Sequence, residues 1–244
     1  RAALHFYCVE ITVPEWDGWR VPIVGSWQLL KSAKAGVWVE LIPVESEKRF
    51  DFKVHKGGAG FAKATKGTKD GPDVVCPQEL WEILHRQGKT DNTSRSIKLN
   101  SLIENHGGLR RWEKSEFIPG PENFFGERLY CIRWENDKGK NVFREPQAHD
   151  LRLEAGVACR VASHFTESQK AGWVPDWRIQ DGEKTHELIR TRGWTHWHHL
   201  FTPRQLLMAT EYSRRIADQP ASVRPALILA LGQIINYSAR LCRW

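Results

Sequence analysis

The chain has 244 residues, of which 41% are hydrophobic and 27% are charged, and this composition favours a packed globular core over intrinsic disorder. The net charge of +7 favours polyanionic partners, nucleic acid first. No run of about 18 apolar residues exists, so we expect no membrane partner. The cysteines are scattered and form no Cys-x-x-Cys pair, which argues against a disulfide framework or a four-cysteine zinc site and favours a cytoplasmic location: Cys8, Cys76, Cys131, Cys159 and Cys242.

Residues 1–80 are predicted to be rich in antiparallel β-structure. Residues 4–11, 19–27 and 37–42 are dense in aromatic and β-branched side chains, as strands are. Phe50, Phe52 and Val54 alternate with polar residues, which is the pattern of a half-buried strand.

Nearly all the net charge lies in one basic segment, residues 48–69. Seven basic residues stand there against one acid, a net of +6, whereas the remaining 29 basic and 28 acidic residues sum to +1. We expect a basic hairpin with a flexible Gly57-Gly58-Ala59-Gly60 loop that contacts phosphates. The alternative is a solvated hairpin that its lysines keep soluble. A cofactor-binding role of the glycine run is disfavoured, because such loops follow fully buried strands.

The middle of the chain, residues 81–185, is predicted to be mixed. A short amphipathic helix is expected over residues 80–87, a polar loop over 91–97 and an apolar strand over 124–134. Residues 151–169 are predicted to form a helix, although Gly156 disfavours one.

The C-terminal part, residues 186–244, is predicted to be a helical pair, which makes the fold class α+β. Thr202 is a good N-cap and Pro203 fits the first helical position, so one helix is expected from there to Asp218. A second helix, over residues 222–241, has a wide apolar face that implies burial against another body.

The block before Thr202 is unusually rich in tryptophan and histidine. The plain structural interpretation is that this block packs the helical C-terminal part against the preceding part of the chain. The large apolar residues that favour it are Trp194, Trp197, Leu200 and Phe201. The block contains His196, His198 and His199. His196 and His198 could share a strand face, but no third ligand is nearby in the sequence, so a metal site is disfavoured. No spacing of nucleophile and base indicates catalysis.

Several phrases carry a family resemblance. The segments are GWRVPIVGSW, ELIPVESEKRFDFKV, LRRWEKSEFIPGPENFFGERLYCIRW, IRTRGWTHWHHLFTPRQLL and ARLCRW. They resemble the large prokaryotic adenine-specific DNA methylases that carry a zinc-ribbon-like insertion. The resemblance covers almost the whole chain in the same order. It implies methyl transfer from S-adenosylmethionine to adenine in DNA, in restriction, phage defence or regulation.

The motifs that perform this chemistry are missing. The family's glycine-rich donor loop and its Asp/Asn-Pro-Pro-aromatic tetrapeptide, which grips a flipped adenine, are both absent, and the chain has no Pro-Pro pair. The resemblance therefore implies an insertion that lies between the two catalytic halves, without catalytic residues and without S-adenosylmethionine of its own. A start at Arg1 in place of Met indicates a processed product or an excerpt of a longer chain.

The resemblance also implies a degenerate zinc ribbon. Where relatives carry two Cys-Pro-x-Cys-like knuckles, this chain reads VPEWDG at residues 13–18 and CPQE at residues 76–79. One thiol cannot hold structural zinc, so we expect a metal-free ribbon in which Trp16, Trp19 and Trp27 fill the space.

Two functional hypotheses follow. In the first, the chain is a target-engaging region that binds DNA, mainly through the basic segment; the candidate residues are Lys48, Arg49, Lys53, Lys56, Lys63, Lys66, Lys69, Arg192, Trp194, Trp197 and Arg204. In the second, it is an interaction module whose apolar C-terminal helix docks on the rest of the methylase polypeptide or on a partner subunit, without touching DNA.

Overall fold

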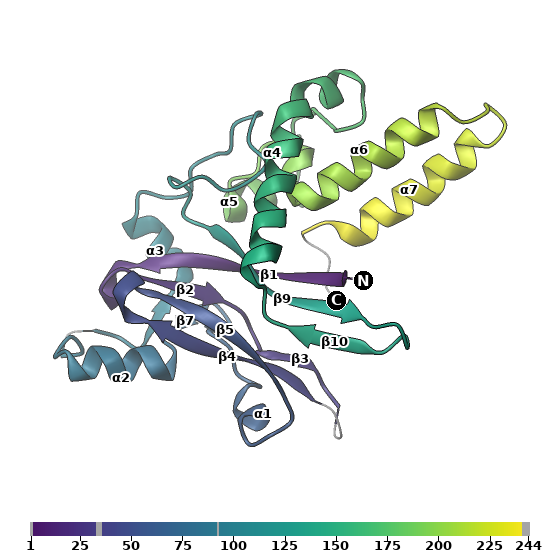
Figure 1. Ribbon diagram of the computed structural model, residues 1–244. Helices are drawn as coiled ribbons and strands as arrows, with labels where there is room; N and C mark the ends of the chain where they lie inside the picture. Colours follow the sequence, from purple (N-terminus) through teal and green to yellow (C-terminus); the bar gives the residue numbers. More distant parts are fainter. Residues whose placement is uncertain (1, 33–35, 92, 241–244) are drawn as a thin grey trace. The chain divides into compact units, whose positions relative to one another are not determined.

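A computed structural model describes residues 2–32, 36–91 and 93–240. These divide into two compact units: unit 1 contains residues 1–108 and 121–147, and unit 2 contains residues 109–120 and 148–244. Unit 1 holds the strands and unit 2 holds the long helices (Figure 1), so the expected α+β class is confirmed. The three-part division of the sequence at residues 80 and 185 stays a prediction.

The first sheet of unit 1 is antiparallel, with the strand order β10-β9-β1-β2. Its strands are β1 (Ala2–Val13), β2 (Trp19–Ile23), β9 (Gly126–Glu135) and β10 (Asn141–Arg144). The short 3-10 helix η1 (Pro14–Trp16) joins β1 to β2. In the register of β1 against β9, Cys8 lies opposite Arg128. One of the two neighbours of β1 is therefore far away in the sequence.

Two further antiparallel sheets complete unit 1, in the orders β3-β4-β5 and β6-β7-β8. The strands are β3 (Gln28–Leu30), β4 (Val37–Val44), β5 (Arg49–Lys56), β6 (Lys69–Asp70), β7 (Asp73–Val75) and β8 (Ser96–Lys98). The helices are η2 (Glu45–Glu47), α1 (Gly60–Lys63), α2 (Gln78–Arg86) and α3 (Leu99–Asn105).

Three sequence expectations in unit 1 need correction. The basic segment is not a hairpin, because β5 pairs with β4 whereas β6 pairs with β7. The strand expected over residues 19–27 ends at Ile23, because the backbone beyond it bonds to the segment before β6: Thr68 donates to Val24 and Trp27 donates to Ala64. The loop expected over residues 91–97 ends in β8.

The core of unit 1 is built largely from aromatic rings. Trp16, Trp19 and Trp27 are all buried. The ring of Trp19 lies 5.4 Å from that of Phe50, and Trp27 meets Tyr130 edge to face at 6.0 Å. Such pairs add to the large area that each ring buries. Replacement of a lost zinc ion by these rings stays a prediction.

Unit 2 is mainly helical. Its helices are α4 (Ala148–Lys170), α5 (His186–Arg192), η3 (Trp197–Leu200), α6 (Pro203–Ala217) and α7 (Arg224–Ser238). The predicted start of α6 is confirmed. The backbone N–H of Thr202 donates to the side chain of Gln205 at 2.7 Å, and the Gln205 N–H faces the Thr202 hydroxyl at 3.4 Å, which forms a reciprocal capping box.

Helix α7 confirms the second predicted helix over Arg224–Ser238, and the predicted end at residue 241 lies outside the described residues. It packs beside α6 (Figure 1) and buries little of its apolar surface there. Leu231 is its buried residue, whereas Ile228 and Leu229 are 58% and 73% exposed. Among the described residues, none of the helices combines the length and the apolarity needed to cross a membrane.

Candidate nucleic-acid interface

The first two cations of the basic segment are engaged in ion pairs. The Lys48 ammonium lies 3.1 Å from the Asp17 carboxylate. The Arg49 guanidinium bonds to Glu47 at 2.6 Å and also to Asp51. Binding a phosphate with either cation therefore means exchanging an existing carboxylate partner for a new anion.

The next two lysines lie on β5 and point in different directions. Lys53 pairs with Glu40 across the strands, and Lys56 pairs with Val37. Because successive side chains of a strand alternate in direction, Lys53 shares its face with His55, whereas Lys56 projects from the opposite face at the end of the strand. Both lysines are exposed.

Lys53 stands beside an ordered aromatic pair. The rings of Trp38 and His55 are stacked, with 4.5 Å between centroids and 18° between planes. The Trp38 indole N–H donates to the Gly57 carbonyl at 2.8 Å, and His55 Nε2 lies 2.6 Å from Glu40 Oε2. One edge of this face is thus fixed by side-chain hydrogen bonds.

Lys63, Lys66 and Lys69 come from a segment whose backbone is held in place. Trp27 N–H donates to the Ala64 carbonyl at 2.9 Å, and Gly67 N–H donates to the Gly25 carbonyl at 3.1 Å. The three lysine side chains are exposed, so their ammonium groups reach solvent from a hydrogen-bonded backbone.

The glycines of the basic segment are explained by turn geometry and packing. Gly57 and Gly58 have positive φ angles of 60° and 83°, which L side chains rarely adopt. A Cβ at Gly60 would lie 2.3 Å from the Trp38 ring, and one at Gly67 would lie 1.8 Å from the Val24 carbonyl oxygen. Close approach to neighbouring groups, rather than a cofactor, accounts for glycine at these last two positions.

The three lysines border a pocket of about 750 Å³ in unit 1. Trp27, Trp38 and Leu41 supply apolar walls. The charged lining groups are Lys63, Lys66, Lys69 and Arg95 against Glu40, Asp70 and Glu79, a net of +1. The lining as a whole therefore carries little net charge, because three carboxylates offset three of its four cations.

Arg95 is a member of this pocket that sequence reasoning missed. Its guanidinium bonds to Gln78 Oε1 at 2.5 Å and lies 5.9 Å from the centre of the Trp81 ring. Arg95 is far from the basic segment in sequence and stands in a stretch that reads as a polar loop. Only the pairing of β7 with β8 brings it here, so the sequence carried no signal for it.

The remaining DNA-binding candidates belong to unit 2. Arg204 forms an ion pair with Glu154, with Nε at 2.9 Å from the carboxylate oxygen. Trp194 is buried with Trp112 in a core cluster, so packing accounts for its size. Trp197 is exposed, and Arg192 ends α5, where a cation complements the helix dipole. Their contact with DNA stays a prediction.

The histidines beside Trp197 are structural groups of unit 2. His199 Nδ1 accepts from the backbone N–H groups of Thr195 and His196 at 3.1 and 3.2 Å, and Nε2 lies 3.1 Å from the Glu113 carbonyl. His198 Nε2 and Nδ1 lie 3.1 Å from the carbonyls of Glu116 and Pro175. Both rings are buried. A neutral ring has a single N–H, so His198 donates to one of its two carbonyls, and the Gln169 side-chain amide lies 3.5 Å from its Nδ1.

Burial sets the charge state of these two rings. It lowers the pKa of His198 to about 4 and that of His199 to about 3, although backbone carbonyls act in the opposite direction. Both are therefore neutral at physiological pH. Within the described part of the chain, no group of three His, Cys, Asp or Glu side chains is placed to hold a metal ion.

Comparison of the chain with protein-family models, with curated proteins and with solved structures gives no match in any of the three.

Proposed function

We propose that this chain is the non-catalytic, target-engaging region of an S-adenosylmethionine-dependent DNA adenine methyltransferase, and that it binds DNA phosphates through its basic segment. One observation carries the DNA-binding part. Five lysines of the segment are exposed and form no ion pair with any described carboxylate: Lys53, Lys56, Lys63, Lys66 and Lys69. Unpaired surface ammonium groups are the groups that release counterions from DNA.

The methylase part of the proposal rests on the sequence phrases quoted above. It places the methyl donor in the catalytic halves of the parent enzyme, since the donor loop and the Pro-Pro motif are missing here. The partners are then DNA and the rest of the methylase polypeptide or a partner subunit. A cytoplasmic location belongs to the same proposal.

Salt dependence provides a quantitative test. Each phosphate contact contributes a slope of about −0.9 to log K against log salt concentration, so five contacts give about −4.5. Fluorescence anisotropy with a labelled duplex measures this slope for the whole chain. We expect a slope of several units and weak sequence preference, because phosphate contacts carry no base information.

A matched pair of variants locates the contact. Substituting Lys53, Lys56 and Lys63 by Ala should reduce the slope by about 2.7 if each lysine makes one contact. Substituting Lys138, Lys140 and Lys184 by Ala removes the same charge from exposed positions outside the basic segment. An equal effect of both triples would mean that net charge alone acts, and an unchanged slope in the first triple would remove the segment from the interface.

Helix α7 favours a second candidate function, that of an interaction module. No charged residue stands between Arg224 and Arg240, and Ile228 and Leu229 are largely exposed among the described residues. Contiguous exposed apolar surface marks protein interaction sites. The full reading frame that encodes this chain shows on which body α7 docks. If donor-loop and Pro-Pro motifs flank the chain, that body is the methylase core.

A double substitution separates the two functions in solution. Ile228→Glu with Leu229→Glu should abolish docking on the flanking methylase domains, measured by sedimentation of separately produced parts, and leave DNA affinity unchanged. Docking that survives the double substitution would exclude this face of α7. A wild-type chain that docks and fails to bind DNA at low salt would favour the interaction module over the DNA-binding region.

A further inference from the structure

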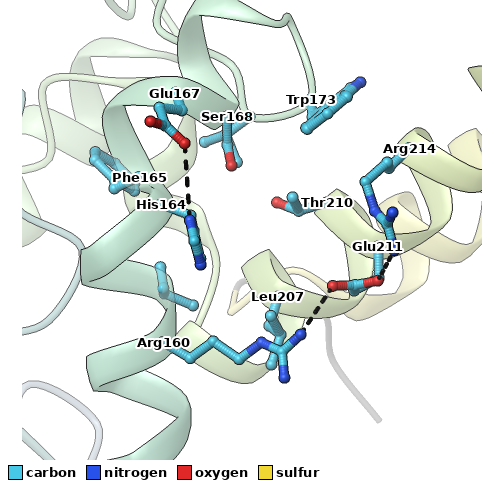
Figure 2. A pocket seen from close by; sticks show the side chains of 12 residues that line it. Arg160, His164, Phe165, Glu167, Ser168, Trp173, Leu207, Thr210, Glu211 and Arg214 are labelled. Atoms are coloured by element: carbon cyan, nitrogen blue, oxygen red, sulfur yellow. Dashed lines mark hydrogen bonds and ion pairs between the residues drawn. The ribbon is translucent and has the colours of Figure 1, made fainter.

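Unit 2 contains a second pocket that none of the functions above uses. It lies between α4 and α6, next to the turn that follows α4, and has a volume of about 260 Å³ (Figure 2). Its floor is apolar and includes Val161, Phe165, Val174 and Leu207, which belong to one hydrophobic cluster. An apolar cavity of about 150 Å³ holds benzene, so this volume suits a single ring with a small substituent.

Two hydroxyl groups in the pocket have no hydrogen-bond partner among the described residues. Ser168 is only 4% exposed, and Thr210 faces it from α6. Figure 2 shows both hydroxyls directed into the space between the helices. Neither oxygen is among the fully buried, unpaired side-chain atoms of the described residues. A purely hydrocarbon occupant would cover both hydroxyls without offering them a partner, which is unfavourable. A ligand with a polar head group gives the Thr210 hydroxyl a partner.

Charge is distributed unequally around the rim. Glu211 lies 3.4 Å from Arg160 and 3.1 Å from Arg214, and its hydrogen bond with Arg214 lowers the pKa of Glu211. Two guanidinium groups against one ionised carboxylate leave one positive charge at this edge. Each guanidinium has five N–H donors, so donors remain after Glu211 is bound.

The opposite rim has a different character. His164 Nδ1 lies 3.8 Å from Glu167 Oε2, and the Glu167 side chain is mostly exposed. An anion placed near Glu167 would be repelled, whereas an anion near Arg214 is attracted. The polarity of the pocket therefore orients a ligand, with its anionic end toward α6 and its ring over Phe165.

We propose that this pocket binds a small aromatic carboxylate, with the ring on the floor formed by Phe165 and Leu207, and the carboxylate accepting hydrogen bonds from Thr210 and Arg214. Trp173 lines the same pocket and can report on an occupant. This inference is independent of DNA binding, because every group that it uses belongs to unit 2 and none belongs to the basic segment.

Benzoate and benzamide are matched probes for the test, since they share the ring and differ in the charge of the head group. The chain is labelled with 5-fluorotryptophan, and the ¹⁹F resonance of Trp173 is assigned with Trp173→Phe. We expect benzoate to shift this resonance saturably at millimolar concentration. Benzamide should bind at least about tenfold more weakly, which corresponds to roughly 1.4 kcal/mol.

Substitutions identify the groups that act. Thr210→Val keeps the side-chain shape and removes the hydroxyl, and Arg214→Gln removes one guanidinium; each should weaken benzoate binding about fivefold or more by loss of one charge-assisted bond. Thr210→Ser keeps a hydroxyl at this position and should bind benzoate as well as the wild type does. Arg215→Gln, one residue further along α6 and outside the pocket, is the matched control. A melting curve of each variant verifies that unit 2 stays folded.

Four results would overturn the proposal. They are the absence of a saturable shift, equal affinity for benzoate and benzamide, an equal loss in the Arg214 and Arg215 variants, or retention of affinity in Thr210→Val and Arg214→Gln together. Binding that is selective for benzoate and is lost in the two pocket variants alone would establish the site.

Discussion

The indole N–H of Trp16 donates a hydrogen bond to the carbonyl oxygen of Ser94 at 2.9 Å, although 78 positions separate them in the sequence. The next residue, Arg95, accepts from the backbone N–H of Cys76 at 2.8 Å. The turn at residues 13–18 and Cys76, which lies just before α2, are thus attached to adjacent residues of one segment. In unit 1, a tryptophan side chain performs one of these two attachments.

Replacement of Trp16 should be costly for stability. Trp16 is fully buried, and truncating a buried Trp to Ala costs about 3–5 kcal/mol. Trp16→Ala should therefore lower the free energy of unfolding by that amount in urea denaturation, whereas Trp16→Phe should lower it less because most of the packing remains. Trp177→Ala, at a side chain that is 73% exposed, is the control. A loss of under about 1 kcal/mol in Trp16→Ala would contradict the structural role.

Gly67 is expected to tolerate no side chain. A Cβ there would lie 1.8 Å from the Val24 carbonyl oxygen, a backbone atom that cannot rotate away. Gly67→Ala should displace the segment that carries Lys66 and Lys69 and destabilise unit 1 by about 1–3 kcal/mol or more. Equilibrium unfolding followed by circular dichroism measures this, and stability equal to that of the wild type would show that the segment is not held as described.

Gly156 is expected to behave in the opposite way. It lies inside α4, is exposed, and has open space where a Cβ would be added. Alanine loses less conformational entropy than glycine in a helix, so Gly156→Ala should raise the free energy of unfolding of unit 2 by about 0.5–1 kcal/mol. The measurement is the thermal midpoint of unfolding, which should rise. A lower midpoint would mean that α4 bends at residue 156 or packs there against a neighbouring element.

The buried histidines predict a dependence of stability on pH. Their folded pKa values, about 4 for His198 and about 3 for His199, lie below the unfolded value of about 6.5. Between pH 6.5 and 4 the unfolded chain therefore binds protons that the folded chain does not. The contribution of these histidines to the free energy of unfolding is fully present above about pH 6.5. It falls as the pH is lowered, by up to about 1.4 kcal/mol per pH unit for each histidine.

Urea denaturation at pH 7 and pH 5 tests this expectation, in a range where carboxylates with lowered pKa values are still ionised. NMR titration of the imidazole protons gives an independent readout, since the His198 and His199 signals should stay at their neutral positions at pH 5. Equal stability at both pH values, or titration of these two rings near pH 6.5, would show that they are not buried as described.

Local signals in the sequence predicted local structure well. The alternation around Phe50 and Phe52 matches β5, and Thr202-Pro203 marks the start of α6, because both depend on residues within one turn or one strand. The local pattern of residues 48–69 likewise predicts a hairpin, but the two ends of this segment pair with different strands. Pairing depends on partners elsewhere in the chain, which no local pattern specifies.

The candidate site was predictable only in part. The charge of the basic segment and the alternation of Lys53 and Lys56 along their strand are visible in the sequence. The pairing of Lys48 with Asp17 and the placement of Arg95 in the same pocket as the lysines depend on tertiary structure. The pocket around Ser168 and Thr210 gave no sequence signal, because isolated hydroxyl residues in helices are common and only packing of α4 beside α6 encloses these two.

The position of β1 between β2 and β9 has a consequence during synthesis of the chain. One edge of β1 is paired as soon as β2 emerges, but the other edge waits for residues 126–135. At roughly 5–20 residues per second, the ribosome takes on the order of ten seconds to deliver them. During that interval an apolar strand edge, LHFYCVEI, faces solvent on every nascent chain, and such edges template association between chains. Synthesis that pauses before residue 126 would therefore lead to aggregation of this protein, and a chaperone that covers Ala2–Val13 would prevent it.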